Sequence, residues 1–470
     1  MTEDRAIRSI CVAGGGIVGL SAAIAFARAL PGTAVTVVET PADPAAIADH
    51  LPTALPGAER FHSAIGLDEG ELVRGGIASH RLGTIFEGWP TGEWAHGYGP
   101  YGKPVGAIPF DSIWVRARDA GKALPYDRYA MAAALARAGK FVHPSSDANS
   151  ASSRFSYSLR LDPDGYRERL RQQALGAGVA FEPGPIDDIE RRGDDGIAAL
   201  IAAGKRIEAD LFVDCTGPAA QLLSALDDSF EDWSAWMPFG RMALATKPGP
   251  DAPQPVDHVV ASASGWTAEW PLRGRTLKVA MSNGDGVAIS RGRRLRPWVR
   301  NVLALGDAAS SADPLHGMNL DLAHNAILLA LELLPKRDFD PLETGEYNRR
   351  AEQVTRRVRD FLALHYVRSG RVDGVWQKAA QAEPPDSLAR TLDQYEYRGR
   401  LPFHEEESVT RDSWTAALLG LGVVPKNVDP QALSVPLDQA IPAMERLVEE
   451  IDALVAPLPG YGDYLARITR

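Results

Sequence analysis

Residues 10–39, ICVAGGGIVGLSAAIAFARALPGTAVTVVE, contain a complete strand–turn–helix–strand pattern. An apolar strand over 10–13 is followed by a G-x-G-x-x-G turn made by Gly14, Gly16 and Gly19. A helix is predicted over 20–30, and a second strand over 34–38 ends at Glu39. In dinucleotide-binding proteins such glycines allow a tight turn, approach of a pyrophosphate and close packing of helix on strand, and the acid binds a ribose. The pattern predicts a doubly wound α/β domain that binds a dinucleotide.

A second segment, 301–320 (NVLALGDAASSADPLHGMNL), has the properties expected of another cofactor contact. An apolar strand over 302–305 leads into Gly306 and Asp307, and small residues follow before a turn at Pro314. The small side chains leave room for a pyrophosphate and a polyol, and the Asp307 carboxylate can accept a hydroxyl of that polyol. We expect this segment to return to the first domain.

Composition limits the class of protein. The 470 residues carry a formal net charge of -11, with 45% hydrophobic and 24% charged residues, as in soluble proteins of two joined domains. The charge argues against nucleic acid as a partner. No membrane-spanning run or secretory segment is apparent, so a cytoplasmic location is expected. Two cysteines in apolar strands predict buried thiols, ten histidines without ligand spacing predict no metal, and the basic run 291–296 fits a solvated face better than a grip on an acidic peptide.

The chain is expected to visit its cofactor domain three times. Segments 1–40, 155–220 and 295–335 are assigned to that domain, with a helix over 159–178 capped by Asp162 and a strand over 209–217. Segments 41–154 and 221–294 are assigned to a substrate-binding domain, with loops over 41–150 and antiparallel strands over 240–290. Residues 336–470 are predicted to be helical, except for an irregular stretch near 380–410.

Motifs along nearly the whole chain carry a family resemblance. They are GGGIVGLSAA, ERFHSAIGLDE, HRLGTIFEGW, ADLFVDCTGPAAQLL, GWTAEWPL, RVRDFLALHYVRSGR and SWTAALLGLGVVP. Together they resemble the flavin-dependent tryptophan halogenase family, within the FAD aromatic-hydroxylase superfold. The resemblance implies a Rossmann-like FAD domain of the glutathione-reductase type, interleaved with an antiparallel substrate domain. It also implies FAD, reduced by NAD(P)H directly or through a separate flavin reductase, and molecular oxygen.

The chain departs from this family at the residues that carry its chemistry. In the family, hypohalous acid reaches a catalytic Lys, and a Glu assists substitution on the indole. Arg81 stands at the position of the Lys, and His316 stands at that of the Glu. Arginine stays protonated, so it cannot form a haloamine, whereas a histidine can act as a base near neutral pH but supplies no negative charge. The resemblance therefore implies a divergent member that lacks the catalytic Lys and Glu.

The altered turn is similar to the P-x-G-x-G-x-N-L turn of aromatic hydroxylases, in which helix amides lie near the flavin. On this basis Pro314, Gly317, Met318 and Asn319 join the predicted cofactor residues. Arg81 and His316 are predicted to be catalytic, and His80, Trp266 and Trp270 are predicted to contact the substrate.

We therefore expect an FAD-dependent monooxygenase whose flavin hydroperoxide hydroxylates or otherwise oxidises an indole. The substrate is an aromatic small molecule or a tryptophan of a peptide or protein, and the enzyme is a monomer or a homodimer. Two alternatives stay open: a halogenase with atypical catalytic residues, and a non-catalytic flavin-binding relative.

Overall fold

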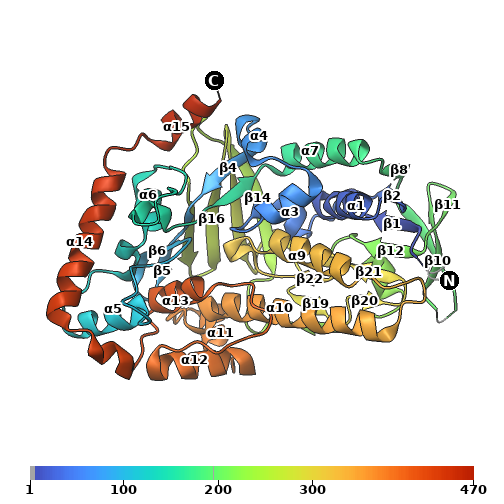
Figure 1. The fold of residues 1–470 in the computed structure, drawn as a ribbon. Coiled ribbons are helices and arrows are strands. Elements are labelled where there is room, and N and C mark those ends of the chain that lie inside the picture. The colour runs from blue at the N-terminus through green and yellow to red at the C-terminus, as the bar shows by residue number, and fades with distance from the viewer. Residues whose placement is uncertain (1–5, 194, 470) are drawn as a thin grey trace.

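The computed structural model describes residues 6–193 and 195–469. In these residues the strands form two large sheets and three small ones, with helices packed around them (Figure 1). The six-stranded sheet lies with α1 at the right of Figure 1, and the seven-stranded sheet lies at the centre. Helix α14 covers the opposite end, and α10 runs along the lower side. The start of the first predicted segment, residues 1–5, lies outside the described residues.

The six-stranded sheet is the predicted dinucleotide-binding sheet. Its order is β20 (Trp298–Val299), β21 (Val302–Ala304), β12 (Leu211–Asp214), β1 (Ser9–Ala13), β2 (Ala34–Glu39) and β8 (Ala180–Pro183). All neighbours pair in parallel except β20 with β21. Ile10 and Val12 enter one hydrophobic core while Cys11 and Ala13 enter another, so both faces are buried, as is usual for parallel sheets.

The seven-stranded sheet is almost entirely antiparallel, and only β5 and β15 pair in parallel. Its order is β18 (Val287–Ala288), β14 (Arg241–Pro248), β17 (Arg275–Ser282), β16 (Gly265–Leu272), β15 (Asp257–Ser262), β5 (Gly83–Trp89) and β6 (Gly92–Gly97). Strand β15 alternates strictly between buried and exposed residues, and Asp257 occupies a buried position. This sheet therefore combines strands from both segments of the predicted substrate domain.

The other strands form three small sheets. They are β3 (Thr53–Ala54), β7 (Ser158–Leu161) and β4 (Ala78–Arg81); β11 (Lys205–Glu208), β10 (Ile197–Ala202) and β9 (Ile186–Arg191); and β13 (Phe230–Asp232), β19 (Gly292–Arg294) and β22 (Ser310–Ser311). The first of these sheets matters most for the site, because it places Arg81 beside Ser158 and Thr53 beside Arg160.

Helices cover the sheets and form most of the C-terminal region. They are α1 (Ile17–Ala29), α2 (Ile47–His50), α3 (Glu59–Ile65), α4 (Glu69–Arg74), α5 (Phe110–Asp119), α6 (Met131–Ala138), α7 (Pro163–Gly176), α8 (Gln221–Ser224), α9 (Asn319–Glu332), α10 (Pro341–Val367), α11 (Gly374–Gln381), α12 (Asp386–Arg398), α13 (Arg411–Gly420), α14 (Leu437–Val455) and α15 (Tyr461–Ile468). Short 3₁₀ turns are η2 (Tyr126–Tyr129), η3 (Ala151–Ser153), η4 (Gly306–Ala308), η5 (Pro314–His316) and η6 (Pro430–Ser434). In the described part of the chain, no helix is both long and apolar enough to cross a bilayer.

The structure confirms the predicted fold class and corrects several local predictions. Helix α7 begins after Asp162, whose carboxylate accepts the Gly165 amide at 2.9 Å as expected, but 158–161 form a strand. Both cysteines are buried and free. Two predictions were wrong: residues 41–150 contain strands of two sheets, and the stretch 380–410 contains α12. The domain boundaries stay a prediction.

Candidate functional site

The glycine turn after β1 is packed as the sequence pattern requires. Gly14 has φ +127, and a Cβ there would overlap the carbonyl oxygen of Cys215. A Cβ on Gly19 would overlap the carbonyl oxygen of Gly14, so α1 packs directly on the turn. Glu39 lies at the end of β2 as predicted, where its carboxylate pairs with Arg171. These placements match the geometry of a dinucleotide-binding turn.

The N-terminus of α1, where the pattern places a pyrophosphate, contacts a carboxylate of the chain itself. The backbone amides of Ile17 and Val18 donate to Oδ1 of Asp49, at 3.3 Å for Val18. A Cβ on Gly16 would overlap the same carboxylate. Asp49 is buried, and this burial raises its pKa. The amide donors therefore fit an anion, and Asp49 stands in the place of a phosphate.

The second predicted anchor, Gly306 and Asp307, contacts the segment that carries Asp49 from its other side. Gly306 has φ +60, and the Asp307 carboxylate accepts the Ala48 amide at 2.9 Å and the Ser311 hydroxyl at 2.8 Å. Helix α2 thus bridges α1 and η4 at the position predicted for the ribityl and pyrophosphate groups. The residues fit FAD on condition that the segment carrying Asp49 moves away.

Asp307→Asn is expected to flatten the dependence of stability on pH. Burial raises the pKa of Asp307 from 3.8 to about 7, so the folded protein retains a proton that the unfolded chain loses above about pH 4. The contribution of the Asp307 carboxyl to the free energy of unfolding is complete below about pH 4, and it is lost as the pH rises through about 7. Urea midpoints at about pH 5 and about pH 8 should differ less in the variant than in the wild type. Exposed Asp187→Asn is the control. A difference between the two midpoints that is as large in D307N as in the wild type would contradict this prediction.

The turn after η4 is held by its own side chains. The Asn319 amide bonds the backbone N and O of Ala312 at 2.9 Å each, and a Cβ on Gly317, which has φ +72, would collide with Thr53. Pro314 opens η5, and Met318 is 8% exposed. Asn319 therefore closes the turn, and the cofactor role of these four residues stays a prediction.

Arg81 lies in a buried cluster of charges. Its Nε donates to Oδ2 of Asp257 at 2.6 Å, and Arg160 donates to the same oxygen. Its other nitrogens donate to the hydroxyls of Thr84, at 2.8 Å, and Tyr98. One carboxylate thus holds two guanidinium groups, each 1% exposed. Arg81 is therefore a fixed cation rather than a mobile surface side chain.

The backbone of His316 lies beside Arg81. Nη2 of Arg81 lies 3.5 Å from the His316 carbonyl oxygen, and the His316 ring Nε2 lies 3.0 Å from Nε2 of His365. Nδ1 of His365 donates to the Phe361 carbonyl at 3.0 Å, so in neutral rings His316 donates to His365.

The surroundings of His316 weaken it as a base near neutral pH. Burial, followed by the neighbouring His365, His96 and Arg81, lowers the pKa of His316 well below its usual value. The ring is therefore neutral at pH 7 and only weakly basic.

The three predicted substrate residues are separated by the fold. Trp266 donates to the Tyr366 hydroxyl at 2.9 Å, and the Trp270 ring lies 3.5 Å below the Arg160 guanidinium. His80 precedes Arg81 in β4, so its side chain points to the opposite face of the strand. The structure thus brings Trp270 near the Arg81 cluster and places His80 elsewhere.

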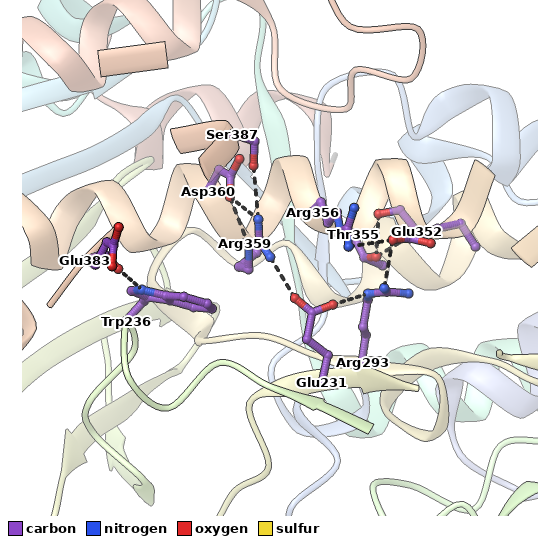
Figure 2. A network of polar contacts seen from close by, with 11 residues as sticks. Glu231, Trp236, Arg293, Glu352, Thr355, Arg356, Arg359, Asp360, Glu383 and Ser387 are labelled. Atoms are coloured by element: carbon purple, nitrogen blue, oxygen red, sulfur yellow. Dashed lines mark hydrogen bonds and ion pairs between the residues drawn. The ribbon is translucent and has the colours of Figure 1, made fainter. Parts of the chain in front are cut away.

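The expected solvated face of the basic run 291–296 is present only at its end, where Arg296 is exposed, whereas Arg293 is buried in ion pairs (Figure 2). Arg293, only 3% exposed, contacts Glu231 at 2.7 Å and Glu352 at 3.1 Å. Glu231 also pairs with Arg359 of α10 at 2.7 Å, so this network ties β13 and β19 to the long helix. Arg294 pairs with Asp228 in the same region.

Several residues at the site were not found from the sequence. They are Asp49, Arg160, Asp257 and His365. Only Asp257 could have been noticed in the sequence. Its strand alternates between buried and exposed residues, and the carboxylate stands at a buried position. The other three are defined only by contacts between distant segments.

Comparisons with known proteins identify the family of the chain. The family model described as tryptophan halogenase matches residues 9–283 and 276–436. The chain is 25% identical to tryptophan 7-halogenase KtzQ of Kutzneria sp. (strain 744), covering 99% of each chain. Among solved structures it is similar to BrvH, a flavin-dependent halogenase from Brevundimonas sp. BAL3, with a TM-score of 0.91, 29% identity and 99% coverage of both chains. Xcc4156, a flavin-dependent halogenase from Xanthomonas campestris, gives a TM-score of 0.90 at 28% identity and 99% coverage of both chains. The chain therefore belongs to the tryptophan halogenase family.

Proposed function

We propose that this protein is a flavin-dependent halogenase that acts on an indole or another electron-rich aromatic ring. The observation that carries the proposal is the contact between Arg81 and His316, because it joins the two segments at which the family has its catalytic Lys and Glu. The assigned activity of the similar KtzQ, BrvH and Xcc4156 is halogenation. Hydroxylation, our expectation from the sequence, has no such support.

The cofactor proposed is FAD, reduced by a separate flavin reductase. When bound, reduced FAD would supply the activation of dioxygen that halide oxidation requires. The amides of Ile17 and Val18 would hold its pyrophosphate once Asp49 withdraws, and Asp307 would accept a ribityl hydroxyl. The phosphate contacts need no cationic side chain, because helix amides supply the donors.

Arg81 is proposed to hold the halogenating oxidant by hydrogen bonding. Its guanidinium keeps its charge and is fixed by Asp257, so it can donate an N–H without forming a covalent haloamine. Neutral His316 cannot stabilise a cationic ring by charge, so it does not replace the family's Glu in that role.

A non-catalytic flavin-binding relative is the second candidate. It is favoured by one observation, the Asp49 carboxylate at the phosphate position. The substrate, including a tryptophan within a peptide or protein, the oligomeric state and the cytoplasmic location all stay predictions.

The decisive assay combines the protein, FAD, a flavin reductase with NADH, and tryptophan or indole, with and without bromide. A brominated product with the two-isotope mass pattern is expected only with bromide. Arg81→Met should lower its rate about 10²-fold, the usual effect of removing one transition-state donor, whereas exposed Arg206→Met should not.

Two results would overturn the proposal. An oxygenated product that forms without halide would indicate hydroxylation. Bound FAD without any product from an aromatic panel would indicate the non-catalytic relative.

A further inference from the structure

We propose that Glu69, His80 and His143 form a binding site for a divalent transition metal of the zinc type. One ligand atom from each residue lies within 4.8 Å of the other two. Nε2 of His80 and Oε1 of Glu69 are 3.5 Å apart. Two imidazoles and a carboxylate are a common ligand set for such metals.

The three residues come from separate segments that the fold brings together. Glu69 begins α4, His80 lies in β4, and His143 lies in the segment after α6. Because His80 and Arg81 alternate along β4, this cluster lies on the face of the strand opposite the Arg81 site. The proposed metal site is therefore distinct from the proposed flavin chemistry and does not rest on it.

Contacts around the cluster already orient its side chains. The Tyr461 hydroxyl accepts the His80 backbone amide at 2.7 Å and lies 2.9 Å from ring Nδ1, which directs Nε2 toward Glu69. The Tyr157 hydroxyl donates to Oε1 of Glu69 at 2.9 Å, and Tyr464 contacts Nε2 of His143 at 2.9 Å. Partners of this kind are typical of metal ligands, because they fix the ring orientation and tautomer.

The spacing suits a small metal ion. Tetrahedral coordination with bonds of about 2.0–2.1 Å separates ligand atoms by about 3.4 Å, which the Glu69–His80 pair already matches. To complete the site, the ligand atom of His143 must come closer to those of Glu69 and His80. His143 is exposed and belongs to no helix or strand. His80 is 2% exposed and stacks on Phe141 at 3.9 Å, so it forms the fixed side of the site.

An open coordination position would face a cavity. Glu69 and Tyr157 line a hollow of about 420 Å³, together with Pro144, the neighbour of His143. Three protein ligands beside a cavity leave room for water or a small anionic ligand on the metal. This inference departs from the expectation of no metal, because the three ligands are far apart in sequence and show no motif spacing.

Cobalt titration of chelator-treated protein tests the proposal. We expect one equivalent of Co²⁺ to bind with the visible absorption of tetrahedral cobalt, and Zn²⁺ to displace it. His143→Ala and Glu69→Gln should each weaken binding by at least about tenfold, because a lost ligand costs more than a lost outer partner. His258→Ala removes another exposed histidine and should leave binding unchanged.

Two outcomes would overturn the proposal. Wild-type protein that shows no cobalt absorption would exclude the site. Cobalt bound equally by wild type and H143A, with unchanged circular dichroism, would place the metal elsewhere. His143 is the main target because it is exposed, so the H143A variant is expected to fold, and the dichroism spectrum checks this directly.

Discussion

Asp257→Ala will lower the free energy of unfolding by about 3–5 kcal/mol, as expected when one partner of a buried ion cluster is removed. Arg81 and Arg160 would then share a buried site without their common carboxylate. Burial already lowers the pKa of Arg160 to about 9, which shows how poorly this site solvates a second cation. Urea denaturation measures the loss. The effect should exceed that of most single substitutions, because two charges lose their partner at once.

Exposed charges provide the matched control. Glu208 pairs with Arg206 at the surface, where its side chain is 69% exposed, so Glu208→Gln should change stability by less than about 1 kcal/mol. A similarly small effect of Asp257→Ala would mean that water reaches the two arginines. In that case the two arginines would not depend on Asp257 for their solvation.

Much of the fold could be predicted because its signals are local. The glycine turn and the apolar strand β1 before it follow from the sequence pattern around Gly14. The prediction of loops over 41–150 failed for a physical reason. Strands such as β4 are buried on both faces and contain polar residues, so neither apolar runs nor alternation marks them. Their polar side chains are satisfied by partners from distant segments.

The candidate site likewise combines features with a local sequence signal and features that depend on contacts between distant segments. Arg81 and His316 were found because each stands at a recognisable motif position. The lowered pKa of His316 could not be found from the sequence, since it depends first on burial and then on the nearby His365, His96 and Arg81. The carboxylate that holds Arg81 lies on another strand, and only tertiary pairing selects it.

One chain of contacts joins the two halves of the site. Strand β3 follows α2 directly, and the Thr53 hydroxyl at its start accepts from Arg160. Arg160 in turn shares Asp257 with Arg81. Contacts through Thr53, Arg160 and Asp257 therefore link the segment that carries Asp49 to the proposed oxidant-binding arginine.

The second large effect is expected for Asp49→Asn, which should tighten FAD binding about tenfold. Hydrogen bonds to a charged acceptor contribute about 1.5–3 kcal/mol and neutral ones about 0.5–1.5, so at a pH where Asp49 is ionised the substitution weakens the contact with the α1 amides by about 1–1.5 kcal/mol. The apparent dissociation constant scales inversely with the fraction of protein whose amides are free. Weakening the internal contact raises that fraction. Titration of FAD followed by flavin fluorescence gives the constant directly.

The sign of this effect separates two roles for Asp49. If the carboxylate only competes with the pyrophosphate, D49N gains affinity while exposed Asp187→Asn does not. If Asp49 instead positions α2 to contact bound FAD, D49N loses affinity, and the proposed competition is wrong. Because Asp307 accepts the Ala48 amide from the same helix, Asp307→Asn provides the comparison. Asp307→Asn weakens the hydrogen bond from the Ala48 amide of α2, but it also alters a proposed flavin contact. Only the competing carboxylate predicts a gain in D49N together with no comparable gain in D307N.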